Sequence, residues 1–283
     1  MKPVRTYHWN DGRSLSLGER TCIMGILNVT ADSFSDGGKW NTLDRALYHA
    51  QELVRDGADI IDIGAESSRP GFQPVSAEVE TGRLAPFLEA LAKEIPVPIS
   101  VDTFKAQTAE TAIGLGANII NDIWGLQYGA EPGAMGAVAA RYGVPVVAMH
   151  NQAAREYTGD IMAAIRTFFR ETLRIAQAAG IDADKLILDP GIGFGKTPEA
   201  NLLVLRRLEE LCELDGREWP LLLGTSRKSF IGAALGLPVE ERMEATGATC
   251  VLGILKGCSI MRVHAVKPIA RMCRMIDAIM EAK

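Results

Sequence analysis

The strongest constraint on the fold is a regular alternation of short apolar runs with amphipathic helical patterns along most of the chain. Short apolar runs closed by glycine or proline are typical of strands that are covered on both faces, as in a parallel sheet. The predicted strands cover residues 22–28, 59–64, 98–102, 118–123, 145–150, 185–189, 220–224 and 259–264. The predicted helices cover residues 43–56, 77–93, 105–115, 134–142, 160–179, 198–214, 244–256 and 266–281.

Eight strand–helix units in 283 residues predict an α/β protein with a single (β/α)8 barrel, the TIM barrel. Before the first unit, Asn10-Asp11-Gly12 separates two short alternating runs, which indicates a β-hairpin. We therefore expect a hairpin extension over residues 1–20 and one barrel domain over residues 21–283. A doubly wound open sheet is the alternative, but the pattern contains no obvious edge strand.

Composition and charge exclude several classes of protein. The net charge of −5 gives no basic footprint for nucleic acid. No uninterrupted apolar run reaches about 18 residues, so we expect no membrane span. The first 18 residues are polar and do not resemble a secretory leader. The odd number of cysteines, five, favours reduced thiols, and we expect a cytoplasmic protein.

Polar side chains occur at the end of every predicted strand. In a TIM barrel these ends meet at the C-terminal mouth, where active sites lie. The residues are Asn28, Glu66, Asp102, Asn121, His150, Asp189, Arg227 with Lys228, and His264. Any one of them could be a helix cap or a satisfied core group, but a polar group at all eight ends predicts a functional mouth.

The side-chain types at the mouth divide into two groups. Acceptors come from Asp102, Asn121 and Asp189, and they suit a flat heterocycle with an amidine-like donor edge, because a carboxylate accepts two parallel hydrogen bonds. Cationic donors come from Arg227, Lys228, Arg262 and His264, and they suit phosphate or diphosphate. Arg262 and His264 are two residues apart on one strand and should project to the same side.

Two long loops follow the first two strands, at residues 28–38 and 66–72. Both are rich in glycine and serine, and loops of this length after barrel strands often act as lids. A third segment, GFGKT at residues 193–197, resembles the end of a P-loop. That motif would need glycine where Pro190 stands, so we reject a P-loop NTPase.

Eight motifs in the same order along the chain resemble dihydropteroate synthase, the folate-pathway enzyme targeted by sulfonamides. They are MGILNVTADSFSDGG, DIIDIGAESSRPG, ISVDTFK, IINDIWG, VVAMHN, LILDPGIGFGK, LLLGTSRKSFIG and SIMRVH. The resemblance implies a TIM barrel, in most members a homodimer, that joins hydroxymethyl-dihydropterin pyrophosphate to p-aminobenzoate and releases pyrophosphate with the help of Mg²⁺.

The resemblance also implies roles for individual residues. Asn28 would bind Mg²⁺. The pterin would be held by Asp102, Asn121, Asp189 and Lys228, with Met149 and Phe194 as apolar walls. Arg262 and His264 would bind the pyrophosphate, and the p-aminobenzoate pocket would be framed by Phe34, Ser68, Arg69, Pro70 and Ser229. Asp32 and Asp36, in the first loop, are implied catalytic residues together with Lys228, Arg262 and His264.

Three positions depart from the family pattern. Ser68 replaces a threonine, Ala31 replaces a proline, and Ala265 replaces an aspartate that follows the final histidine. Two alternatives to the synthase follow. One is a catalytically weak pterin-binding paralogue, suggested by Ser68 and Ala265. The other is a barrel of the methyltetrahydrofolate:corrinoid methyltransferase type, against which residues 226–232 and the Arg262–His264 pair argue.

Overall fold

The computed structural model describes residues 3–29, 42–66 and 75–282, and within these ranges it contains one eight-stranded parallel sheet. Its strands are β3 (Cys22–Asn28), β4 (Ile60–Gly64), β5 (Ile99–Asp102), β6 (Ile119–Asp122), β7 (Val146–Met149), β8 (Leu186–Asp189), β11 (Leu222–Leu223) and β12 (Ile260–Val263). The spatial order is β11-β12-β3-β4-β5-β6-β7-β8. Leu188 N–H donates to Pro220 O at 2.9 Å, and Leu188 forms a parallel bridge with Leu221. The two ends of this order, β8 and the start of β11, therefore also pair, and the sheet closes. The predicted barrel is confirmed, and the open-sheet alternative is wrong.

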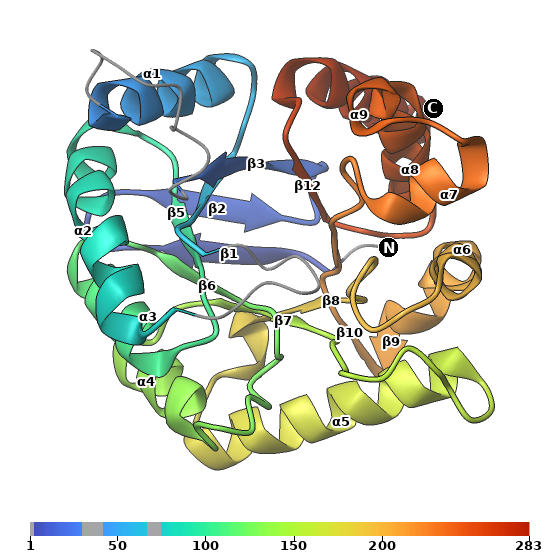
Figure 1. The fold of residues 1–283 in the computed structure, drawn as a ribbon, viewed down its shortest axis with the longest axis horizontal. Helices are drawn as coiled ribbons and strands as arrows, with labels where there is room; N and C mark the ends of the chain where they lie inside the picture. Colours follow the sequence, from blue (N-terminus) through green and yellow to red (C-terminus); the bar gives the residue numbers. More distant parts are fainter. Residues whose placement is uncertain (1–2, 30–41, 67–74, 283) are drawn as a thin grey trace.

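Helices ring the strands in chain order (Figure 1). They are α1 (Thr42–Arg55), α2 (Ala77–Glu94), α3 (Ala106–Gly114), α4 (Ala134–Tyr142), α5 (Ile161–Ala179), α6 (Pro198–Arg206), α7 (Ser229–Leu235), α8 (Met243–Leu255) and α9 (Val266–Glu281). In the described part of the chain, none of these helices combines the length and the apolar character that crossing a bilayer requires.

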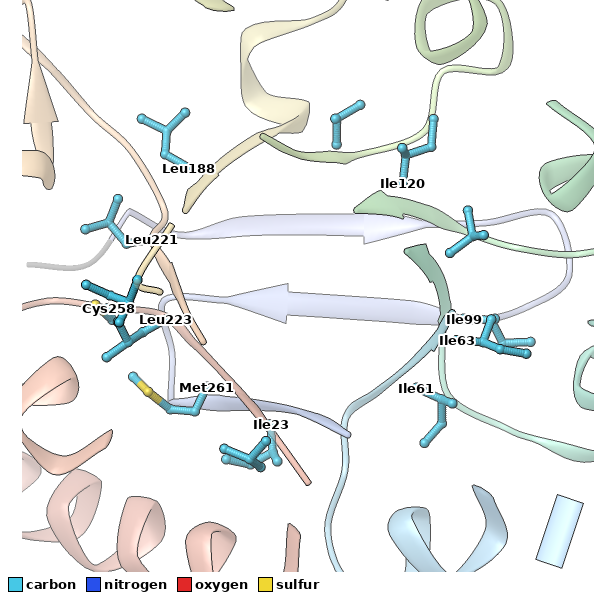
Figure 2. Close-up of a cluster of buried hydrophobic side chains, with 14 of the residues drawn as sticks. Ile23, Ile61, Ile63, Ile99, Ile120, Leu188, Leu221, Leu223, Cys258 and Met261 are labelled. Carbon is cyan, nitrogen blue, oxygen red and sulfur yellow. The ribbon is translucent and has the colours of Figure 1, made fainter. Parts of the chain in front are cut away.

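The main core lies between the sheet and the helices. Side chains alternate along each strand, so every second residue points outward, and in this barrel most of those residues are apolar. Figure 2 shows part of this layer around the barrel, including Ile61, Ile120, Leu188 and Met261, each with no exposed surface. The outer layer anchors the strands, and the inward residues are left to form the interior of the barrel.

The N-terminal hairpin closes one end of that interior. Strands β1 (Arg5–His8) and β2 (Ser14–Leu17) pair antiparallel, as the Asn-Asp-Gly turn predicts, and Figure 1 shows them across the centre of the ring. Tyr7, Leu15 and Leu17 pack against one layer of inward-facing strand residues, namely Cys22, Met24, Ile60, Ile119, Val147, Ile187, Leu222 and Ile260. Because these residues lie in the N-terminal halves of their strands, the open end is the C-terminal mouth.

Two predicted elements need correction. The helix expected over residues 198–214 ends at Arg206, and the 3-10 turn Leu208–Leu211 and the strands β9 (Glu213–Leu214) and β10 (Arg217–Glu218) follow it. Asp215 and Gly216, which lie between these strands, have φ of 54° and 81°, the conformation of an Asp-Gly hairpin turn. The segment between β11 and α8, for which no helix was predicted, contains α7.

Candidate active site

A layer of polar side chains lies one step above the apolar layer inside the barrel. It is formed by the residues two positions farther along four strands: Asp62 on β4, Asn121 on β6, Asp189 on β8 and Arg262 on β12. Asp62, Asn121 and Asp189 are buried. Burying a charge costs free energy unless a partner compensates it, so each charged group of this layer needs a hydrogen-bond or ion-pair partner.

Arg262 is held between two carboxylates. Its Nε donates to Asp62 Oδ2 and its Nη2 to Asp102 Oδ2, both at 2.6 Å. Asn121 Nδ2 also donates to Asp62 Oδ2, at 3.1 Å. Burial would lower the pKa of Arg262, but Asp62 and Asp102 hold it above its ordinary value. The guanidinium is therefore charged and fixed in orientation, since each carboxylate takes a different nitrogen.

Asp189 and Lys228 form the second half of the layer. Asp189 Oδ1 accepts from Gly191 N–H at 2.7 Å, and burial raises the pKa of Asp189 against the opposing charge of Lys228. Burial lowers the pKa of Lys228 to about 8, although Asp189 counteracts this shift. Lys228 Nζ lies 4.7 Å from the centre of the Phe194 ring and donates to Ile192 O. A cation and an aromatic ring thus lie side by side at the mouth.

The two halves of the polar layer influence each other's charges. Burial raises the pKa of Asp102, Arg262 opposes the rise, and Lys228 opposes it as well. Arg262 likewise acts on both Asp189 and Lys228. A Cβ added at Gly224 would lie 3.8 Å from both Arg262 Cβ and Lys228 Nζ, so these two cations lie near one backbone position and connect the two halves.

A further group of donors lies at the end of β12. His264 Nδ1 is 3.0 Å from Ser226 Oγ, which also accepts from the His264 backbone N–H at 3.3 Å. The next residue, Ala265, is the N-cap of α9 and supplies no side-chain cap. Backbone N–H groups at a helix N-terminus favour anions, so this side of the mouth is suited to a negatively charged group.

The remaining predicted residues have different positions. Met149 is buried and pairs in register with Asp189, whereas Phe194 is half-buried. Asn28 is exposed at the end of β3, and Ser229 is exposed as the first residue of α7. Six predicted residues lie outside the described ranges: Asp32, Phe34, Asp36, Ser68, Arg69 and Pro70.

Comparisons with known proteins agree with this geometry. Residues 24–264 match the model of the pterin binding enzyme family. The dihydropteroate synthase of Bacillus subtilis is 53% identical over 267 residues, which cover 94% of this chain and 91% of that protein. The chain belongs to the pterin-binding enzymes and, among them, to the dihydropteroate synthase family.

Solved structures of this family superpose closely. A dihydropteroate synthase from Clostridium difficile, crystallised with pteroic acid, is 48% identical with a TM-score of 0.89, covering 94% of this chain and 99% of its own. The enzyme from Xanthomonas albilineans, crystallised with 4-aminobenzoic acid, is 38% identical with a TM-score of 0.91, and the match covers 100% of both chains. The family predicted from the eight motifs is therefore confirmed.

Two strand-end residues do not join the polar layer of this family member. Glu66 Oε1 accepts from Val75 N–H at 3.0 Å, and its carboxylate pairs with Lys105, which also binds Glu80. His150 is buried against Phe168, with ring centres 4.9 Å apart. The polar groups at these two ends are satisfied by protein partners, so the interpretation of all eight ends as one mouth was too broad.

Asp62 is the residue that the sequence analysis missed. It has no exposed surface, it contacts both Arg262 and Asn121, and its Oδ1 has no hydrogen-bond partner within the described residues. The signal was available, because DIIDIG places a charged residue in the middle of an otherwise apolar strand. The prediction considered only the residues at the strand ends, and Asp62 lies in the middle of β4.

Proposed function

We propose that the chain condenses 6-hydroxymethyl-7,8-dihydropterin pyrophosphate with p-aminobenzoate, giving 7,8-dihydropteroate and pyrophosphate in folate biosynthesis. The observation that carries this proposal is the polar layer of Asp62, Asn121, Asp189 and Arg262, together with Asp102, which binds Arg262, and Lys228, which lies beside Phe194. A flat heterocycle with donor edges fits the acceptors, and a diphosphate fits the donors. Both halves of one substrate are therefore accommodated by adjacent groups.

The pterin would bind between the acidic layer and the Phe194 ring. Asp102 and Asp189 each use one oxygen in a protein contact, and a carboxylate accepts several hydrogen bonds. Met149 and Phe194 would form the apolar walls. Because Asp189 and Asp102 are already oriented by Gly191 N–H and Arg262, binding requires little reorganisation, which is the condition for strong electrostatic stabilisation.

The reaction would break the carbon–oxygen bond between the pterin methylene and the diphosphate, and would form a carbon–nitrogen bond to the amine. Positive charge that develops on the pterin would be stabilised by the nearby carboxylates. The departing diphosphate would be received by Arg262, His264 and the N-terminus of α9. The amine is itself a nucleophile, and after it attacks, it loses a proton to solvent.

We propose Asp32 and Asp36 as further catalytic groups and Phe34, Ser68, Arg69, Pro70 and Ser229 as the frame of the aminobenzoate pocket.

We propose Mg²⁺ as the cofactor, with Asn28 as its protein ligand. In the described ranges, no group of three or more His, Cys, Asp or Glu residues could hold a metal ion. An exposed amide oxygen next to a diphosphate is nevertheless a suitable partial site, since Mg²⁺ retains waters and takes substrate phosphates as ligands. When bound, the metal would neutralise charge on the leaving group.

We further propose a homodimer in the cytoplasm. Six large apolar side chains are exposed on the elements from α7 to α9: Leu235, Val239, Leu255, Met275, Ile279 and Met280. Apolar groups exposed on successive elements favour contact with a second copy. The cytoplasmic location is favoured by the substrate, because a charged diphosphate is retained where it is made.

The central experiment is a steady-state assay of pyrophosphate release with both substrates. We expect turnover that requires p-aminobenzoate and falls by orders of magnitude in Lys228→Ala, the matched inactive control. Release that does not depend on p-aminobenzoate would contradict the synthase activity.

Calorimetry of the pterin diphosphate with and without Mg²⁺ tests the metal, and Asn28→Ala should abolish the difference between the two affinities. Equal affinities in the wild type would contradict the role of Asn28.

A further inference from the structure

The loop of residues 191–195, between β8 and α6, lies directly against the chain that follows β7. Gly191 and Gly195 have φ of 67° and 52°. A Cβ at Gly191 would lie 1.9 Å from His150 O, and one at Gly195 would lie 2.5 Å from Gln152 O. The backbone of the loop therefore approaches its neighbour more closely than any side chain would allow.

Lys196 holds this loop from within the protein. It is 5% exposed, and its Nζ contacts His150 Nδ1 at 2.8 Å, Gly191 O at 2.9 Å and Phe194 O at 3.1 Å. An ammonium group has three donors and no acceptor, so these contacts use its full capacity. Two of them fix carbonyl groups within the loop, and the third ties the loop to the end of β7.

His150 is a neutral acceptor in this arrangement. It is 2% exposed, and its ring packs against Phe168 and Tyr157. Burial, with a smaller contribution from the charge of Lys196, lowers the pKa of His150 to about 2. Burial lowers the pKa of Lys196 to about 7, although Asp189 counteracts this shift. In its charged form Lys196 can only donate, so Nδ1 of the imidazole then accepts and the ring proton is on Nε2.

The loop also carries the Phe194 ring, which lies beside the candidate site. Phe194 is half-buried, and its ring centre lies 4.7 Å from Lys228 Nζ. Lys228 donates to Ile192 O in the same loop. Two lysines thus bind one five-residue loop, Lys228 beside the polar layer and Lys196 from the buried side next to His150.

We propose that Lys196 is a positioning residue for pterin recognition, which acts by fixing the carbonyl groups of Gly191 and Phe194 so that the Phe194 ring is held against the bound heterocycle. The inference rests on the proposed function, because it requires a pterin at this site. It assigns to Lys196 a part in affinity that goes beyond stabilising the fold.

A double-mutant cycle on pterin affinity tests the inference. Calorimetry with 6-hydroxymethylpterin would compare the wild type, Lys196→Met, Phe194→Ala and the double variant. We expect Lys196→Met to weaken binding roughly tenfold in the wild-type background, the effect of about one charge-assisted hydrogen bond. In the Phe194→Ala background, the same change should weaken binding less than about twofold, because the group through which Lys196 acts is already gone.

Lys185→Met is the matched control. Lys185 is also part-buried and also donates to a backbone carbonyl, Gly143 O, but it lies at the opposite end of β8. We expect it to lower the thermal midpoint and to leave pterin affinity unchanged in both backgrounds. A Lys196→Met variant that changes only the thermal midpoint, as Lys185→Met should, would overturn the proposal.

The remaining outcomes are equally distinct. Equal losses of affinity in the two backgrounds would mean that Lys196 does not act through Phe194, and would also overturn it. His150→Leu removes one of the three acceptors and should show the same coupling at smaller size, which keeps the test open if Lys196→Met does not fold. A wild-type protein that fails to bind the pterin would instead contradict the proposed function itself.

Discussion

The two ends of the barrel interior are built from the same strands and differ in almost everything else. At the end covered by the hairpin, Ile60, Ile119, Ile187 and Ile260 form an apolar layer with no exposed surface. Two residues farther along the same four strands lie Asp62, Asn121, Asp189 and Arg262. One step along a strand therefore changes the interior from a packed core into a network of buried charges.

The difference teaches that burial alone does not separate structural residues from functional ones in this molecule. Asp62 is as buried as Ile60, which lies on the same strand. The two layers differ in the effect of burial on free energy. Burial of the isoleucine layer is favourable, because apolar surface leaves water. Burial of the polar layer costs desolvation energy, which is recovered only where the charges are paired. Substitutions in the two layers should accordingly affect different measurements.

The largest effect is expected at the polar end. Asp102→Ala and Lys228→Ala should each reduce kcat/KM by roughly two to three orders of magnitude, because each removes a charged partner of the bound pterin. The thermal midpoint should remain close to that of the wild type, since both side chains carry a desolvation cost in the folded protein. Steady-state kinetics and thermal unfolding measure the two quantities. Near-normal turnover in either variant would break the assignment of the site.

The apolar end should respond in the opposite way. Ile187→Ala should destabilise the protein by about 2–5 kcal/mol, the range for deleting a fully buried aliphatic side chain. The kcat/KM of the folded protein should change by less than about twofold, because the layer lies on the far side of the polar groups. Denaturant unfolding gives the stability, with Ile187→Val as the milder control at about 0.5–1.5 kcal/mol. A large loss of turnover without loss of stability would remove the distinction between the two ends.

Asp62 sharpens the comparison because it has the burial of one layer and the charge of the other. Asp62→Asn keeps the shape and an acceptor for Arg262 Nε, but removes the ion pair. We expect kcat/KM to fall roughly ten- to thirtyfold, the effect of weakening one charge-assisted contact. Stability should also fall, because the buried guanidinium of Arg262 loses one of its two charged partners, although Asp102 still pairs with it. If unfolding changes strongly and turnover does not, Asp62 belongs with the structural residues.

The sequence supported most of this arrangement, for identifiable reasons. The strands were recognisable because parallel strands buried on both faces are continuous apolar runs. The mouth was recognisable because the C-terminal ends of barrel strands meet on one face, so their polar residues could be read as one set. The spacing could not show which polar groups face inward. Glu66 and His150 each find a protein partner far along the chain, at Lys105 and Lys196, and only the fold reveals those contacts.

The prediction of a helix over residues 198–214 was wrong at its C-terminal end for a related reason. Residues 207–214 continue a helical pattern, and tertiary contacts override it. Arg207 leaves helical geometry with φ of −113° and binds both Asp160 and Glu210. The Asp215-Gly216 turn then pairs two short strands. A local preference for helix lost to an ion-pair network and a turn, neither of which is visible in an apolar periodicity.

The smallest expected effect concerns the boundary between the polar layer and the anion side of the mouth. Ala265 is the N-cap of α9 and offers no side-chain acceptor, so the N–H groups of Val266 and Lys267 are available to an anion, whereas Pro268 at the third position has none. Ala265→Asp, which restores the residue usual in the family, should cap those groups and place a negative charge beside the diphosphate. We expect the KM for the pterin diphosphate to rise about two- to fivefold, less at high salt because the added repulsion is screened. A gain in stability of about 0.5–2 kcal/mol from the new cap should accompany it.

Ala265→Gly, which adds neither charge nor acceptor, is the matched control and should leave KM unchanged. A lower KM in Ala265→Asp would mean that the aspartate orients His264 instead, and that the anion side depends on side chains more than on the helix N-terminus.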